Sequence, residues 1–258
     1  MAKIKDKVKK TVKTVFIITG ILFAIFGFII GYSVVKDLKQ EELLKQEIIN
    51  YSNKNLATDN FDITVKTTGD YAYVEEAIKK YFKKLSDEVK KVNSYLNNEK
   101  ITKILTPENL KNDRPNYLIS HNTIKDARLN VNNGINEIKE LCAEEKIKNL
   151  LDKKKLDDPE YYHDFYMQLM YTDSDKEEFE ELNKNMDVLS QNVNAFFDKV
   201  DEILLFLEKN DSLIEYKEEM IYFHSEQILN EYKKHLSELD EVANKIKVEE
   251  EKEEADSL

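Results

Sequence analysis

The sequence has few of the residues that form tight turns, and it lacks residues that many functional sites require. Its 258 residues include only 5 Gly, 3 Pro and 1 Cys, and no Trp. An all-β sandwich or barrel needs a turn about every 8–12 residues, so this composition argues against that class. A single Cys excludes a disulfide framework and a Cys-rich zinc site.

Arginine is also scarce. Only 2 of the 39 basic residues are Arg, and the formal net charge is -12. Nucleic-acid-binding domains usually present a basic face on which Arg makes bidentate contacts. We therefore expect no nucleic-acid partner.

The charge that is present is divided unevenly along the chain. Residues 1–35 contain six Lys and one Asp, a net charge of +5, whereas residues 36–258 contain 33 basic and 50 acidic residues, a net charge of -17. Three of the five Gly also lie in the first 35 residues. The chain changes character near Lys36.

An uncharged run of 21 residues, VFIITGILFAIFGFIIGYSVV, occupies positions 15–35. As a helix it would span roughly 31 Å, close to the hydrocarbon thickness of a bilayer. The apolar part of a signal peptide usually has only about 7–15 residues. We therefore predict an uncleaved transmembrane helix that contacts lipid, with a cleaved signal peptide as the alternative.

The flanking charges predict the orientation of this helix. Residues 1–14 form a basic tail, which the positive-inside rule retains in the cytoplasm. The rest of the chain is then extracytoplasmic, in a single-pass protein of the cell membrane. Gly27 and Gly31 form a Gly-x-x-x-Gly pair that allows close helix approach. A homodimer through this pair is an open alternative.

Apolar residues at helical spacing dominate the remainder. We interpret residues 36–58 as a stalk and linker, 59–247 as a helical-bundle domain and 248–258 as an acidic flexible tail. The predicted long helices cover 70–98, a segment opened by Pro115, about 35 residues around positions 179–207, and 217–247, with a short helix at 106–112. The fold class is all-α: an antiparallel bundle of about four long helices.

Several local features accompany these helices. Asp70 is predicted to cap the helix 70–98, whose Lys79 and Lys80 are assigned to its solvated face. The small size of Gly134 suggests a close helix contact. The strongest periodicity repeats every seven residues and predicts shallow-angle packing; it comprises Phe179, Met186, Val193, Val200 and Leu207.

A short extended segment interrupts the helical pattern near 60–66. Phe61, Ile63 and Val65 alternate with polar residues, which is the spacing of a strand. This segment is either a strap across the bundle or half of a small strand pairing. Leu213, Ile214 and Tyr216 offer a possible but poor partner for such a pairing.

The candidates for catalysis are few. The histidines are His121, His163, His224 and His235. Glu160 and His163 match one Glu-x-x-His element of a di-iron bundle, but no second copy exists. Glu231 and His235 are four residues apart, a spacing that holds a metal only weakly. We predict no catalytic, cofactor-binding or metal-binding residues and no enzyme activity; His121 and Cys142 are interpreted as packing residues.

The Tyr-rich helix at 159–171 is the most individual feature. Its aromatic and Met residues are Tyr161, Tyr162, Phe165, Tyr166, Met167, Met170 and Tyr171. One interpretation is a helix wedged into the core between longer helices. The other is an exposed patch for a protein partner or a small ligand, since Tyr and Met suit such surfaces.

The layout of an anchor followed by an extracytoplasmic helical bundle is similar to the sensor portion of bacterial receptors, without a second membrane span or a cytoplasmic signalling domain. The leading hypothesis is a non-enzymatic interaction or scaffold module at the cell envelope, with an unknown protein partner. The alternative is a sensor-like bundle that holds a small apolar or aromatic molecule near 159–171. A third hypothesis is a surface that binds divalent metal or polycations through the acidic charge.

Overall fold

The computed structural model describes residues 39–171, 173–217 and 219–256. The basic tail 1–14, the predicted membrane helix 15–35 and the pair Gly27 and Gly31 lie outside these residues. Within the described ranges, none of the helices combines the length and apolar character that crossing a membrane requires.

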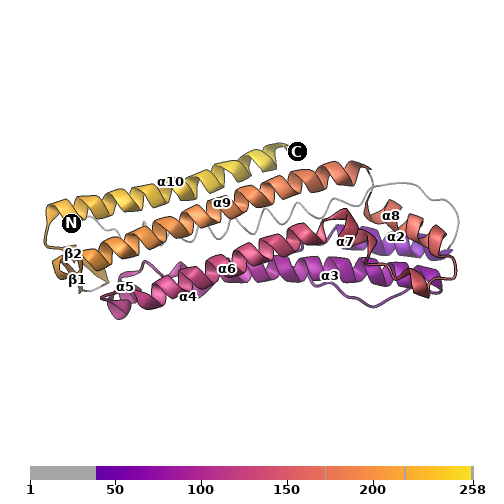
Figure 1. The fold of residues 1–258 in the computed structure, drawn as a ribbon, viewed down its shortest axis with the longest axis horizontal. Helices are drawn as coiled ribbons and strands as arrows, with labels where there is room; N and C mark the ends of the chain where they lie inside the picture. Colours follow the sequence, from indigo (N-terminus) through magenta and orange to yellow (C-terminus); the bar gives the residue numbers. More distant parts are fainter. Residues whose placement is uncertain (1–38, 172, 218, 257–258) are drawn as a thin grey trace. The chain divides into compact units, whose positions relative to one another are not determined.

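The described chain is mostly helical (Figure 1), which confirms the fold class in its coarse form. The helices are α2 (Lys39–Ser52), α3 (Asp70–Leu96), α4 (Glu99–Thr102), α5 (Pro107–Asp113), α6 (Leu118–Leu141), α7 (Glu144–Lys148), α8 (Pro159–Met170), α9 (Asp173–Lys209) and α10 (Glu226–Asp256). Single 3-10 turns occupy Lys153–Lys155 and Asp211–Leu213. The strands β1 (Ile214–Lys217) and β2 (Met220–Phe223) form an antiparallel hairpin.

The described residues divide into two compact units. The strap unit comprises residues 39–92 and 134–187, and the hairpin unit comprises residues 93–133 and 188–256. Helices α3, α6 and α9 each contribute residues to both units.

Several predicted elements are confirmed. Helix α9 has 37 residues and carries the seven-residue repeat. Helix α5 begins with Pro107 after Thr106, whose Oγ1 accepts a hydrogen bond from Asn109 N, as a helix cap does. Helix α6 begins at Leu118, three residues later than the prediction from Pro115.

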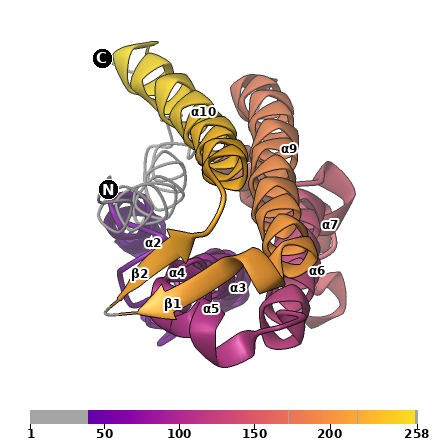
Figure 2. The ribbon, with the colours of Figure 1, turned by 90° about the vertical axis from the view of Figure 1, so that its left-hand side faces the viewer.

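The prediction of a helix from residue 217 is wrong for its first nine residues. This stretch contains β2, whose Phe223 pairs with Ile214 and whose Met220 pairs with Lys217 (Figure 2). Ile221 fits both a helical stripe and a strand, so spacing alone could not separate the two. Helix α10 begins only at Glu226 and continues to Asp256, through most of the segment predicted as a flexible tail.

The segment near 60–66 is a strap and not a strand. No ladder partner is found for it among the described residues. The alternative, a pairing with Leu213, Ile214 and Tyr216, is wrong, because β1 pairs with β2. Phe61 is buried and stacks on Phe82 of α3, with ring centroids 6.2 Å apart, while Tyr51 of α2 meets Phe61 edge-on at 5.4 Å. These aromatic contacts hold one end of the strap against α2 and α3.

Gly134 of α6 makes the close helix contact that its size suggested. A Cβ placed on Gly134 would collide with Cγ2 of Val92, a fully buried residue of α3. Val is stiff at χ1 in a helix, so its methyl group has little room to turn away. The two helices therefore approach closely only because residue 134 has no side chain.

Candidate functional site

Helix α8 buries part of its Tyr-rich face in the core of the strap unit. Phe165, Tyr166 and Met170 are buried, whereas Tyr161 is 49% exposed. The hydroxyl of Tyr166 donates a 2.9 Å hydrogen bond to the backbone oxygen of Ile147, and burial raises the pKa of this phenol. The wedged-helix interpretation therefore describes three of the seven candidate residues.

A smaller aromatic edge remains at the start of α8. Tyr162, like Met167 and Tyr171, is only partly buried. The ring of Tyr71 on α3 meets Tyr162 edge-on at 5.1 Å, and Tyr162 in turn meets Tyr161 at 5.0 Å. The exposed patch is therefore smaller than the seven residues predicted from the sequence. It is a partly open aromatic edge centred on Tyr161 and Tyr162.

A network of buried charges lies beneath the strap. Lys79 of α3 is 2% exposed, which corrects its assignment to the solvated face. Its ammonium lies 2.6 Å from Glu75 Oε1 and 2.9 Å from Glu47 Oε2, and it donates to Thr64 O at 2.7 Å. Because each of these oxygens comes from a different segment, Lys79 joins α2, α3 and the strap.

The carboxylate of Glu75 binds the strap directly. It accepts hydrogen bonds from the backbone nitrogens of Lys66 and Thr67 and from Thr67 Oγ1, at 2.7 to 3.0 Å. Lys66 Nζ reaches back to Glu47 Oε1 at 2.6 Å. These bonds replace the strand ladder that the strap lacks, which satisfies backbone donors that would otherwise be unpaired.

The titration of these groups follows from their surroundings. Burial raises the pKa of Glu47 and Glu75, but hydrogen bonds from lysines and from the strap outweigh it, and both pKa values fall below their usual level. Burial lowers the pKa of Lys79, but its two carboxylate partners more than reverse the effect. All three groups are therefore charged at neutral pH, and their bonds are structural.

Asp70 does not cap α3 as predicted. It is the first residue of that helix, and its Oδ2 accepts hydrogen bonds from the backbone nitrogens of Asp157 and Asp158, at 3.0 and 3.2 Å. Asp158 in turn caps α8, since its Oδ1 accepts from Tyr161 N at 3.2 Å. Asp70 thus positions the start of the Tyr-rich helix.

Two reactive residue types are buried in the strap unit. Cys142 lies in the core, and burial raises the pKa of its thiol to about 12, which makes it a poor nucleophile. His163 is also buried, and its Nε2 has no hydrogen-bond partner among the described residues. Burial, together with the charges of Lys153 and Lys148, lowers the pKa of His163 despite the adjacent Asp164.

In the hairpin unit, side-chain contacts hold β1 and the turn before it against the residues that precede α6. Tyr117 is fully buried, and its hydroxyl lies 2.7 Å from that of Tyr216 on β1. Arg114 makes a two-pronged ion pair with Asp211, with Nε and Nη2 at 2.9 and 2.8 Å from the carboxylate oxygens, while its guanidinium lies over the Tyr216 ring. Figure 2 shows the hairpin beside α5, which contacts β1.

Large apolar side chains are exposed close to these contacts. Leu118 and Ile119 of α6 are 57% and 63% exposed, and Leu205 of α9 is 55% exposed. Leu213, just before β1, is also exposed. Together, Leu118, Ile119, Leu205 and Leu213 are called the apolar rim below.

A second polar cluster joins α9 to α10 within the hairpin unit. Lys199 Nζ lies 2.6 Å from Glu202 Oε2, one turn along α9, and 3.2 Å from Glu238 Oε2 on α10. His235 of α10 adds a ring nitrogen to the group: ligand atoms of Glu202, His235 and Glu238 all lie within 4.8 Å of one another. Sequence spacing could not reveal this trio, because two helices supply it.

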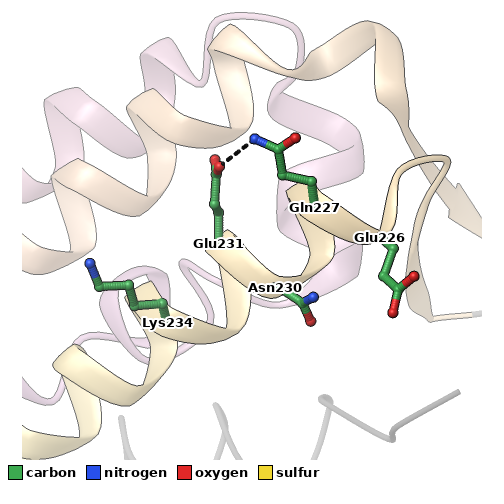
Figure 3. Close-up of a pocket in the computed structure, with 5 residues that line it drawn as sticks. All are labelled: Glu226, Gln227, Asn230, Glu231 and Lys234. Atoms are coloured by element: carbon green, nitrogen blue, oxygen red, sulfur yellow. Dashed lines mark hydrogen bonds between the residues drawn. The ribbon is translucent and has the colours of Figure 1, made fainter.

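The remaining histidines are His121 and His224. His121 is partly buried, as expected: its Nδ1 lies 2.7 Å from Asp201 Oδ1, and its Nε2 has no hydrogen-bond partner among the described residues. His224 is exposed after β2. An open hollow along the first turns of α10 is lined by Glu226, Gln227, Asn230, Glu231 and Lys234 (Figure 3).

Comparison of the chain with known protein families, characterised proteins and solved structures finds no match. The function therefore has to be argued from the arrangement of the residues alone.

Proposed function

We propose that this chain is a membrane-anchored helical-bundle protein that acts as a non-enzymatic interaction or scaffold module at the cell envelope. The uncharged run at 15–35 and the basic residues before it support a single-pass anchor with an extracytoplasmic bundle. The proposal of a protein partner rests on the exposed side chains of the apolar rim. The tight bonding of the buried charges beneath the strap supports a structural role for that unit.

Two members of the apolar rim, Leu118 and Leu205, lie at the same end of a helix pair in the hairpin unit. Helices α6 and α9 run antiparallel, because Arg128 bonds Asp198 while His121 bonds Asp201. Leu118 lies one turn before His121, and Leu205 lies one turn after Asp201. The two leucines therefore flank the same seam at the same end of the helix pair.

The supporting surface is well fixed. Three side-chain pairs link α6, or the turn before it, to α9 or the residues that follow it: Arg114 with Asp211, His121 with Asp201, and Arg128 with Asp198. A surface that is already ordered loses less conformational freedom on binding. Exposed apolar groups surrounded by polar residues are typical of protein interaction sites.

The test is affinity capture of the full chain from solubilised envelope membranes. A Leu118→Ser, Leu205→Ser variant should lose the partner, whereas a control with Lys125→Ser and Glu208→Ser, which changes two exposed polar residues of the same helices, should retain it. Partner yields that are equal in the two variants would refute a role for the rim. The mass of the captured species also tests for a second copy of the chain.

The sensor-like alternative rests on the aromatic edge at Tyr161 and Tyr162. Their edge-to-face stack with Tyr71 offers a planar ligand an aromatic wall of partly open rings. A thermal-shift screen of small aromatic molecules tests it, because a ligand that binds the folded state raises the melting temperature. A shift that survives Tyr161→Ser would place the ligand elsewhere.

A further inference from the structure

We propose that Glu202, His235 and Glu238 bind one divalent transition-metal ion of the zinc type, and that Lys199 competes with the metal for the two carboxylates. The ion would link α9 to α10, two helices that lie side by side in the hairpin unit (Figure 1). This binding would be an addition to the interaction role proposed above and does not depend on it.

The geometry needs only small side-chain movements. Ligand atoms around a tetrahedral ion at about 2.0–2.2 Å lie roughly 3.5 Å from one another, and the three ligand atoms here are already within 4.8 Å. His235 and Glu238 are one turn apart on α10 and project from the same side of the helix. Glu202 reaches them from α9, so the ligands come from two separate directions.

The environment of His235 favours an ordered ligand. Its ring lies against Phe206 of α9, with ring centroids 5.0 Å apart. Its Nδ1 is buried and has no hydrogen-bond partner among the described residues. A histidine with an unsatisfied buried nitrogen loses hydrogen-bonding energy, and metal coordination by this imidazole would give it a strong polar interaction.

The donor set selects the class of metal. One imidazole nitrogen and two carboxylates suit zinc and its transition-metal neighbours, whereas calcium and magnesium prefer oxygen ligands alone. Three protein ligands leave a position for water. Cys142 is not among the grouped ligand residues in the described part of the chain, and its side chain is buried.

Lys199 shows that this place already attracts a cation. Its ammonium bridges Glu202 and Glu238, the two carboxylates that the metal would need. A metal must displace this ammonium, which lowers the apparent affinity. Removing the positive charge should therefore strengthen metal binding at this place.

The structure also distinguishes this trio from the spacing-based pair Glu231 and His235. The amide of Gln227 donates to Glu231 Oε1 at 3.1 Å, and Figure 3 shows Glu231 directed toward Gln227. In the described part of the chain, Glu231 is not among the grouped ligand residues. Glu231→Gln is therefore a matched control: it removes a nearby carboxylate of α10 without touching the site.

The experiment is calorimetric titration of Zn²⁺ into the full chain in detergent, in a chelator-free buffer. We expect one ion per chain, an affinity at least tenfold weaker in His235→Ala and Glu238→Gln, and no change in Glu231→Gln. Lys199→Met should bind roughly tenfold more tightly, since one competing unit charge is gone. Co²⁺ bound to the same ligands should show visible d–d absorption that His235→Ala abolishes.

The proposal would be overturned by the absence of saturable binding, by equal binding in His235→Ala and the unaltered chain, or by equal weakening in Glu231→Gln. Because His235 is partly buried, its replacement also affects packing, and a melting curve must accompany it. Glu202→Gln provides the second variant, since Glu202 is exposed and its loss should not unfold the chain. Unaltered zinc affinity in a folded Glu202→Gln variant would contradict the three-ligand site.

Discussion

Replacing Lys79 with Met tests whether the buried charges hold the strap in place. The change removes the ammonium while keeping an unbranched side chain of similar length. It leaves Glu47 and Glu75 buried without their shared cation, and it leaves the Thr64 oxygen without a donor. Breaking a buried ion pair by removing one partner typically costs about 3–5 kcal/mol, because the remaining charge is uncompensated.

Other hydrogen bonds to Glu47 and Glu75 should reduce this loss of stability but not remove it. Glu75 would keep three donors from residues 66 and 67, and Glu47 would keep Lys66. We therefore expect a loss near the lower end of that range, about 3 kcal/mol. Urea unfolding followed by circular dichroism measures it, and limited proteolysis should show earlier cleavage within residues 53–69.

Lys80→Met is the matched control for this prediction. Lys80 is the next residue of α3, and its ion pair with Glu76 has the same 2.6 Å separation as that of Lys79 with Glu75, but both of its partners are exposed. Exposed pairs contribute about 0–1 kcal/mol. If the two variants lost the same stability, burial would not be what gives the network its importance.

The pH dependence supplies a second check on the same network. Glu47 and Glu75 have folded-state pKa values below the usual 4.5, so the unfolded chain binds more protons as the pH falls through this region. Their contribution is complete above about pH 4.5 and disappears as the pH falls through the folded values. The stability gap between Lys79→Met and Lys80→Met should therefore narrow in acid; a constant gap would contradict the assignment.

Three further predictions concern packing and protonation. Gly134→Ala should destabilise the chain by about 1–3 kcal/mol in urea unfolding, because the new methyl group meets Val92; a stabilised variant would show that the helices can separate freely. His163 is buried with a lowered pKa, so the unaltered chain should lose stability as the pH falls below 6.5 toward the folded value, and His163→Gln should remove this part of the slope. Tyr166→Ser should cost about 3–5 kcal/mol, since it empties a fully buried site, whereas Tyr161→Ser should change the melting temperature little; similar melts would refute the division of α8 into buried and exposed sides.

Helical spacing predicted the long elements well where it was strongest. The seven-residue repeat through Phe179 and Leu207 identified α9, and the apolar stripe from Tyr71 to Leu96 identified α3. The hairpin was missed because Ile221 and its neighbours fit a helical stripe as well as a strand. Positions 218 and 219 are both Glu, so the sequence there lacks the Gly or Asn that usually marks a hairpin turn.

The sites were harder to predict because they depend on contacts between distant segments. Lys79 and Lys80 look alike in the sequence, and only the strap, packed over one of them, makes Lys79 a buried residue. The trio around His235 likewise requires that α9 and α10 meet in one register. For the Tyr-rich helix, the sequence allowed either a core or a surface position. In the structure, some residues of that helix are in the core and others are at the surface.

The most direct test of the proposed interaction role is photo-crosslinking in intact membranes. A photoreactive residue placed at position 118 of the full chain should give one discrete adduct, whose mass identifies either another protein or a second copy. The same probe at position 125, also exposed and two turns along α6, should give little of it. Equal labelling from the two positions, or a diffuse smear from position 118, would contradict a partner that binds at the apolar rim.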